Sequence, residues 1–418
     1  MTSREKIQLA LNHWEGELPV DFGTTGVTGI HCRVIEGLRR HYGLEDKPVK
    51  VIEPFQMLGE VDEELQQIIG TDVTGILGRT DMMGCTELEY HLQTTSWGQK
   101  VLISKEIDMT TDSNGSAYVF AKGDRSYPPS AVMPSGCYFF NGIERKFAVD
   151  DDTLDINDNL EEFGPMSDID LEYFVSQVDK AQNTGKAVIA SFGGAALGDI
   201  AFIPGMSLKD PKGIRSVAEW YMSTIVRSNF INKLFDKQID IAIDNYRKLW
   251  DRVGDKVDVV FTCGTDFGTQ ESQFCSAETY SNLWLPHYKR MNDWIHLNTT
   301  WKVFKHCCGS ITPLIPAMIE SGFDILNPVQ INAKNMNPQQ LKDEFGQQLV
   351  FWGGGIDTQQ VLPNASPSQV KEHVRRQCEI FGKGGGFVFN SVHNVQANAP
   401  IENVVAMFET LNELRNKK

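Results

Sequence analysis

The chain has 418 residues, of which 41% are hydrophobic and 22% charged, and its 55 acidic and 39 basic residues give a formal net charge of −16. This composition is typical of a globular protein and excludes an intrinsically disordered chain. The acidic balance argues against general binding to nucleic acid or to anionic membranes, since both require a basic surface.

The chain also lacks the signals of membrane insertion and export. No apolar run approaches the roughly 18 residues that span a bilayer, and the N-terminal MTSREKIQLALNHWEGE has no apolar signal-peptide core. We therefore expect a cytoplasmic protein with no membrane partner and no nucleic-acid partner. The chain has eight cysteines and no CxxC pair, so in the cytoplasm we expect most of them to be free thiols. The adjacent Cys307 and Cys308 are the exception, because they could have a chemical role.

Helical segments recur along the chain, with apolar residues spaced three and four apart. The first predicted helix covers 3–13, with Ser3 as its N-cap, and the others cover 212–228, 229–250, 276–296, 311–321, 338–345, 367–381 and 400–415. Short apolar runs between them predict buried strands at 187–192, 257–262, 301–305, 323–327, 348–353 and 386–390. The segment 18–23 (LPVDFG) is a further strand candidate.

The alternation of strands and helices predicts parallel βαβ units. We expect an α/β protein with a (β/α)8 TIM-type barrel, built as a single domain over 1–418, and we keep an open doubly wound sheet as the alternative. No GxGxxG motif opens a helix, so a dinucleotide site is not predicted. Residues 84–170 are rich in Gly, Pro, Asp and Ser. They predict an inserted antiparallel excursion, either a lid over the barrel mouth or a peripheral hairpin.

Polar and metal-binding residues gather at the ends of the predicted strands, where a barrel carries its active site. These residues are Asp266 after 257–262, His306, Cys307 and Cys308 after 301–305, Gln330 after 323–327, Asp357 and Gln359 after 348–353, and Asn390, His393, Asn394 and Gln396 at or after 386–390. We take Gln330, Asp357, Asn390 and Asn394 as candidate substrate-binding residues. Helix capping is the alternative role for Asp357 and the two asparagines.

His306, Cys308 and His393 form the clearest candidate site. Histidine nitrogen and cysteine thiolate are preferred zinc ligands, and alternate residues at a strand end face the same way, so Cys307 points aside. Three ligands would leave one position open, as in a catalytic zinc site. A hydrogen-bonding histidine beside a small buried cysteine is the alternative. Asp266 and His393 are candidate catalytic residues, and capping the next segment is the alternative role for Asp266.

Three long blocks carry a family resemblance: HCCGSITPLIPAMIESGFDILNPVQ, FGQQLVFWGGGIDTQQVLPNASPSQVKEHVRR and GKGGGFVFNSVHNVQANAPIENVVAMFE. From about residue 180 to the end, the chain resembles the uroporphyrinogen decarboxylase superfamily. The resemblance implies a (β/α)8 barrel with its active site in the mouth. It also allows a homodimer, since barrels of this superfamily often dimerise.

The superfamily contains tetrapyrrole decarboxylases and cobalamin-linked methyltransferases. The decarboxylases carry an arginine-rich segment near the start, where this chain has DFGTTGVTGIH, and an essential Asp where this chain has Arg79. The methyltransferases bind zinc through H-x-C-G, which His306-Cys307-Cys308-Gly309 matches, and through a later Cys whose place His393 takes here. The GTDFG and VHNVQ blocks resemble those of methyltransferases that demethylate methoxylated aromatic compounds.

The resemblance therefore implies zinc as cofactor, a small-molecule methyl donor, and a corrinoid (cobalamin) cofactor on a separate carrier protein. No D-x-H-x-x-G segment, typical of the carrier itself, occurs in this chain. Two alternatives remain open. One is a metal-independent decarboxylase or other lyase that uses Asp266 and His393. The other is a non-catalytic barrel that binds a tetrapyrrole or corrinoid.

Overall fold

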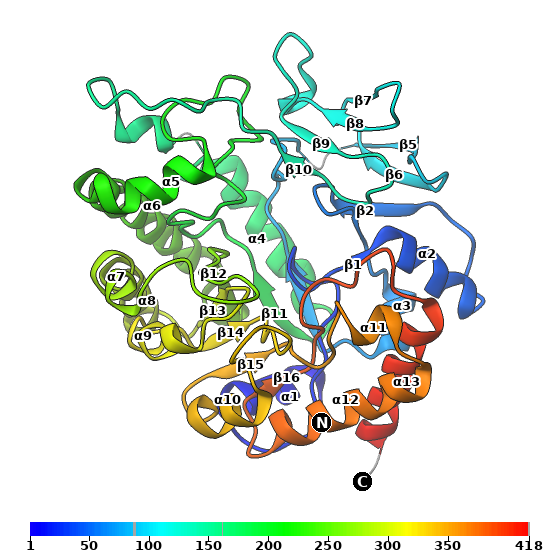
Figure 1. The fold of residues 1–418 in the computed structure, drawn as a ribbon. Coiled ribbons are helices and arrows are strands. Elements are labelled where there is room, and N and C mark those ends of the chain that lie inside the picture. The colour runs from blue at the N-terminus through cyan, green and yellow to red at the C-terminus, as the bar shows by residue number, and fades with distance from the viewer. Residues whose placement is uncertain (87–88, 161, 417–418) are drawn as a thin grey trace.

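The structure is a computed structural model that describes residues 1–86, 89–160 and 162–416. Its centre is a curled, parallel sheet of TIM type (Figure 1). Within the described residues the sheet has seven strands, in the spatial order β16 (Phe387–Val388), β15 (Val350–Trp352), β14 (Ile325–Asn327), β13 (Lys302–His306), β12 (Val259–Cys263), β11 (Ala187–Ala190) and β4 (Val73–Ile76).

The predicted strand at 18–23 is a single bridge instead of a regular strand. Val20 pairs in parallel with Phe389, whose N–H donates to the carbonyl of Pro19 over 2.9 Å, and the N–H of Asp72 donates to the carbonyl of Val20 over 2.8 Å. The segment therefore lies between the two edge strands, β16 and β4. The fold is confirmed as a TIM-like α/β architecture, with seven regular strands and one bridging segment where eight strands were expected.

The strand β4 was missed because its sequence, VTGI, is short and contains a glycine. The glycine is required, since a Cβ at Gly75 would lie 1.7 Å from the carbonyl oxygen of Thr24. A neighbouring backbone segment that crosses a strand this closely leaves no room for a side chain.

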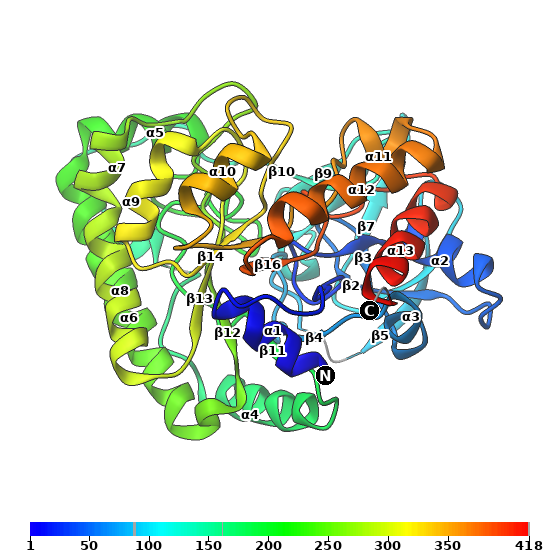
Figure 2. The same cartoon turned by 90° about the horizontal axis from the view of Figure 1, so that it is seen from below.

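Alternate strand residues fill the interior of the curled sheet. This interior cluster is closed at one end by α1 (Ser3–Leu11), through Ile7, Ala10 and Leu11, and Figure 2 shows α1 across the strands. The strand members are Val73, Ala187, Ile189, Val259, Phe304, Ile325, Val350, Trp352 and Val388. The N-cap of α1 is Thr2, which forms a capping box with Glu5, so the prediction of Ser3 was wrong by one position.

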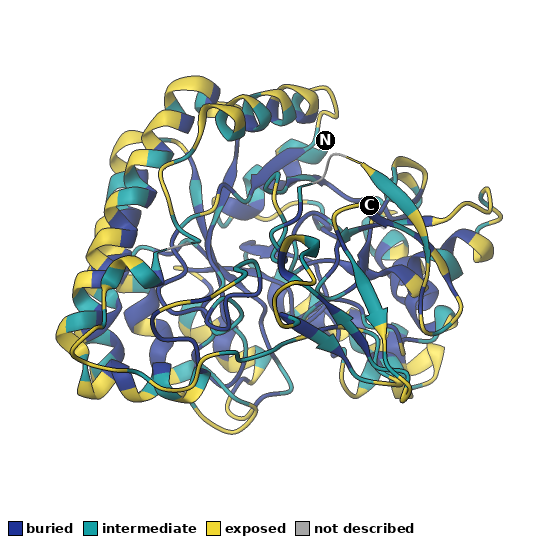
Figure 3. Cartoon of the chain, turned by 90° about the horizontal axis from the view of Figure 1, so that it is seen from above, coloured by how far each residue is buried: buried dark blue, intermediate teal, exposed yellow. Residues whose placement is uncertain are grey.

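Helices cover the outside of the sheet, and residues on their outward faces are exposed (Figure 3). They include α4 (Asp168–Gln182), α5 (Val217–Val226), α6 (Ser228–Val253), α7 (Ala277–Leu283), α8 (Leu285–Asn298), α9 (Ile315–Glu320), α10 (Pro338–Phe345), α11 (Val361–Asn364), α12 (Pro367–Gly382) and α13 (Ile401–Asn416). The predicted helix 276–296 is two helices, because Pro286 lacks the N–H that a continuous helix would need and instead opens α8. The helix α4 was not predicted.

The predicted excursion contains antiparallel strands. A four-stranded sheet comprises β10 (Asn141–Gly142), β9 (Ala131–Met133), β8 (Ala117–Val119) and β7 (Met109–Thr111). A five-stranded sheet joins β5 (Tyr90–Thr94) and β6 (Lys100–Ser104) to the earlier β1 (Ile30–His31), β2 (Val49–Glu53) and β3 (Leu58–Gly59), which lie outside the predicted boundaries. The division into a barrel and an 84–170 insertion stays a prediction.

The remaining α-helices among the described residues are α2 (Cys32–His41) and α3 (Glu63–Ile69). None of the described helices combines the length and the apolar composition that crossing a membrane requires. All eight cysteines are free thiols.

Candidate metal centre and the recess beside it

The structure brings the three predicted metal ligands together. His306 is the last residue of β13, and its Nε2 lies 3.3 Å from the Sγ of Cys308, two residues further on. The ring of His393, in the segment after β16, lies 5.3 Å from the ring of His306. One ligand atom from each of the three residues lies within 4.8 Å of the other two. We call these three side chains the ligand cluster.

A neighbouring strand fixes the orientation of His306. Its Nδ1 lies 2.7 Å from the Oδ1 of Asn327, at the end of β14. The Nδ2 of Asn327 donates to the carbonyl of Trp352 over 2.7 Å, so the amide oxygen must face the histidine, whose Nδ1–H donates to it. The lone pair on Nε2 then faces Cys308, as in metal-binding histidines. The sequence analysis missed Asn327, although it lies at a strand end like the other candidates.

Two of the predicted residues hold the backbone of the cysteine loop. The Oδ1 of Asp266 accepts from the N–H of Cys308 over 2.6 Å, and the Oε1 of Gln330 accepts from the N–H of Gly309 over 2.6 Å. The same Asp266 oxygen lies 3.8 Å from the Nε2 of His306. Asp266 therefore borders the ligand cluster, while the observed contact of Gln330 is structural, and its role in substrate binding stays a prediction.

The other three candidate substrate-binding residues contact the scaffold. The Oδ1 of Asp357 accepts from the N–H groups of Gln359 and Gln360 in the turn before α11. The N-cap of α11 is Gln360, so Asp357 does not take the capping role considered as an alternative. Asn394 accepts from the N–H of Gly29 and donates to the carbonyl of Gly26, and Asn390 donates to the carbonyl of Asp21. These contacts join the segment after β16 to the bridging segment and the loop after it. A substrate role for the three stays a prediction.

Burial sets the protonation of the ligand cluster. It lowers the pKa of both His306 and His393 to about 4, so both rings are neutral near pH 7 and carry free lone pairs. Burial, with the nearby charge of Asp266, raises the pKa of the Cys308 thiol well above its usual value, so a metal would have to displace that proton.

The cluster fits a zinc ion. Two ligands of a tetrahedral zinc, at about 2.0 Å for nitrogen and 2.3 Å for sulfur, stand roughly 3.5 Å apart, close to the distance between His306 and Cys308. Cys307 points away, as predicted, and its Sγ accepts from the N–H of Phe267 over 3.2 Å. Two nitrogen donors and one sulfur donor leave a fourth position for water or substrate.

A recess of about 410 Å³ lies beside the cluster, and the sequence analysis did not find it. Its walls include α5 and the loop between β12 and α7, and among the described residues Asp266 is the one charged side chain that lines it. Tyr221, on α5, and Phe274, in the loop, both line it, and their rings stack against each other at 4.9 Å with an interplanar angle of 23°. An aromatic residue on a helix and one in a loop about fifty residues further on carry no sequence signal that they meet.

A buried lysine joins β13, which carries His306, to the loop after β12, which carries Asp266. The Nζ of Lys305 donates to the carbonyls of Thr265 and His306, over 2.6 and 2.8 Å. The same Nζ lies over the rings of Phe267 and Tyr288. Lys305 therefore does not contact the ligand cluster, to which the next residue, His306, belongs.

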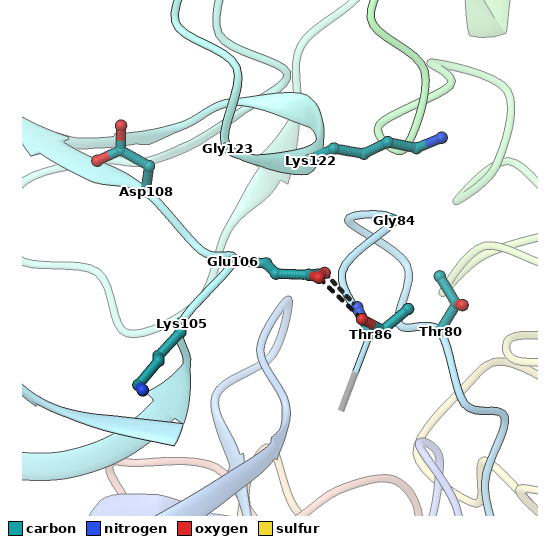
Figure 4. Close-up of a pocket in the computed structure, with 8 residues that line it drawn as sticks. All are labelled: Thr80, Gly84, Thr86, Lys105, Glu106, Asp108, Lys122 and Gly123. Carbon is teal, nitrogen blue, oxygen red and sulfur yellow. Dashed lines mark hydrogen bonds between the residues drawn. The ribbon is translucent and has the colours of Figure 1, made fainter. Parts of the chain in front are cut away.

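A separate hollow of about 600 Å³ lies between the segments 80–86 and 105–123, and none of its lining residues belongs to the predicted site (Figure 4).

Comparisons with solved structures report similarity of fold. A methyltransferase from Methanosarcina mazei matches with a TM-score of 0.54 at 12% identity, over 99% of this chain and 99% of that chain. A protein named AoRut matches 57% of this chain and 70% of its own, at a TM-score of 0.34 and 10% identity. An endo-glycoceramidase II from Rhodococcus sp. matches 55% of this chain and 61% of its own, at a TM-score of 0.30 and 11% identity. A comparison with curated proteins finds no match.

The sequence itself matches one family model, described as uroporphyrinogen decarboxylase (URO-D), over residues 212–414. This range begins later than the predicted start near residue 180. It contains all three residues of the ligand cluster and five of the seven strands of the central sheet. On this match, residues 212–414, slightly less than half of the chain, belong to the uroporphyrinogen decarboxylase family.

Proposed function

We propose that this chain is a methyltransferase that moves a methyl group from a small methoxylated aromatic donor to the cobalt of a corrinoid held by a separate protein. Zinc, bound by His306, Cys308 and His393, would be its metal. The observation that carries the proposal is the convergence of these three side chains, with ligand atoms within 4.8 Å of one another, at the carboxyl ends of two strands. The fold shared with the Methanosarcina methyltransferase over the whole chain supports it.

The residues of the site have separate roles in this proposal. The chemistry that zinc supplies in such a site is Lewis-acid polarisation of the oxygen that loses the methyl group. His306 and His393 offer neutral nitrogens, and Asn327 keeps His306 in the ligating orientation. Asp266 holds the Cys308 loop through one oxygen and would position the donor or take up a proton. His306 is buried, and Cys308 and His393 are partly buried, so electrostatic interactions at the cluster are stronger than in bulk water.

The direct test is metal content and methyl transfer in a Cys308→Ala variant. The wild-type protein should contain about one zinc per chain and methylate cob(I)alamin from a methoxylated aromatic compound. Loss of a ligand should exceed the roughly 10- to 100-fold loss that outer-shell changes cause, so the variant should lose both the metal and the activity. Elemental analysis and the cobalamin absorbance spectrum measure the two quantities.

The matched control is Cys307→Ala, since this neighbouring thiol faces the Phe267 N–H and not the ligand cluster. This variant should keep its zinc and most of its activity. Full methyl transfer by metal-free Cys308→Ala protein would reject the role of zinc. A wild-type protein that contains no zinc and transfers no methyl group would reject the whole proposal and favour the metal-independent lyase, in which Asp266 and His393 act alone.

A further inference from the structure

The hydroxyl of Tyr221 is a buried polar group that lacks a partner. Within the described residues, no hydrogen-bond partner is found for it. Its ring is held by the stacking contact with Phe274, and burial raises the pKa of the phenol, so the group is a neutral O–H donor. A buried donor without an acceptor costs roughly 1–3 kcal/mol, and such a group in a protein calls for an explanation.

The hydroxyl belongs to a residue that lines the 410 Å³ recess beside the ligand cluster. This volume lies within the roughly 300–1,000 Å³ of small-molecule sites. Trp220, Phe267 and Trp284 add aromatic surface to its walls. Asp266 links the recess to the cluster, because it lines the recess and its Oδ1 lies 3.8 Å from the Nε2 of His306.

We infer that the recess binds the body of the methyl donor, and that Tyr221 donates a hydrogen bond to an oxygen of it. This inference rests on the proposed function for the identity of the reacting group. Tyr221 is then a specificity-determining residue, which selects a flat apolar molecule that carries a hydrogen-bond acceptor.

The contacts favour a neutral oxygenated ring over a quaternary ammonium donor. Tetramethylammonium has no atom that could accept from Tyr221, so with this cation the hydroxyl would stay unpaired. Cation recognition by an aromatic cage needs free ring faces, and the stacking contact already uses one face of Tyr221 and one face of Phe274. The one carboxylate in the recess, Asp266, already accepts from the N–H of Cys308.

Calorimetric titration of the full-length protein tests the inference. The probes are 2-methoxyphenol, toluene as a ring without an acceptor, and tetramethylammonium as a cation. In Tyr221→Phe, which removes only the hydroxyl, the Kd of 2-methoxyphenol should rise roughly three- to tenfold, while the Kd of toluene should not change. Tetramethylammonium should bind at least about tenfold more weakly than 2-methoxyphenol.

The matched control is Tyr246→Phe. Its hydroxyl is also buried without a partner among the described residues, but it lies on α6 and does not line the recess. This variant should bind all three probes like the wild type. An unchanged Kd for 2-methoxyphenol in Tyr221→Phe, or tighter binding of tetramethylammonium, would overturn the inference.

The titration needs neither zinc nor a corrinoid, so its failure is distinguishable from that of the proposed function. Binding of 2-methoxyphenol that depends on Tyr221, without any methyl transfer, would contradict the proposed function alone. Methyl transfer whose KM is unchanged in Tyr221→Phe would contradict this inference alone.

Discussion

Asn327 shows how one side chain prepares a ligand for a metal. An isolated histidine interconverts between two tautomers, and only one of them leaves Nε2 free. The Asn327 amide is held by the Trp352 carbonyl and faces the Nδ1 of His306 with its oxygen, which favours the tautomer with a free Nε2. Asn327 would therefore contribute to zinc affinity through His306, although it would not touch the metal itself.

Replacing Asn327 by Leu should lower zinc affinity roughly 10- to 100-fold, because the Nδ1–H of His306 then lacks an acceptor and the ring loses its fixed orientation. Competition with a chromophoric chelator measures the affinity. Asn327→Asp keeps an acceptor oxygen at the same place and should retain most of the affinity. Equal affinities in the Leu variant and the wild type would show that Asn327 does not orient the ligand.

At the scale of elements, the site depends on two loops whose backbones touch. Gly309, after β13, has φ +93°, and a Cβ there would lie 2.3 Å from the carbonyl carbon of Gly268, in the loop after β12. The N–H of Ser310 also donates to the carbonyl of Thr269 over 2.7 Å. The glycine of the H-x-C-G motif therefore serves a close backbone approach, which places Cys308 beside the loop that carries Asp266.

Gly309→Ala should lower both stability and zinc affinity, since the new Cβ cannot be accommodated without moving one of the two loops. We expect a loss of more than about 2 kcal/mol in the free energy of unfolding, because the left-handed conformation alone costs roughly 1–2 kcal/mol. Gly136→Ala is the matched control: it also has a positive φ, +78°, but open space around it. Chemical denaturation compares the two, and similar losses would exclude a role for the contact.

At the scale of the molecule, stability and chemistry lie at opposite ends of the curled sheet. The helix α1 closes one end with Ile7, Ala10 and Leu11, and the ligand cluster lies where the strands end at the other. In TIM-barrel enzymes the active site generally lies at the carboxyl ends of the strands, and the opposite end contributes to stability. The five-stranded sheet also contacts the end that carries the ligand cluster. The N–H of His31, in β1, donates to the carbonyl of Val395, two residues after His393.

Ile7→Ala should therefore destabilise the protein without changing its metal site. Ile7 is fully buried, and removal of such a side chain leaves a cavity that costs about 2–5 kcal/mol. Urea denaturation should show this loss, while zinc affinity, measured on the folded variant, should stay within about twofold of the wild type. A large change in affinity would mean that the two ends of the sheet are coupled.

Local patterns predicted most of the C-terminal part of the fold. Six of the seven sheet strands were predicted, because each is a short apolar run buried on both faces, bounded by turn residues. The bridge at Val20 and the strand β4 were not correctly predicted, since their pairing and close backbone approach involve partners distant in sequence. The roles of Gln330 and Asp357 were also undetermined, because one polar side chain can serve a loop or a ligand equally well.

The sequence by itself determined the type of fold, the end of the sheet that carries the polar residues, and the three candidate ligands, because periodicity and strand ends are local properties. Only the tertiary structure decided that Asn327 faces His306, that Asp266 holds the Cys308 loop, and that Tyr221 and Phe274 enclose a recess beside them. Each of these contacts joins residues from different strands, helices or loops. Their distances follow from how the strands and helices pack together, which no local pattern encodes.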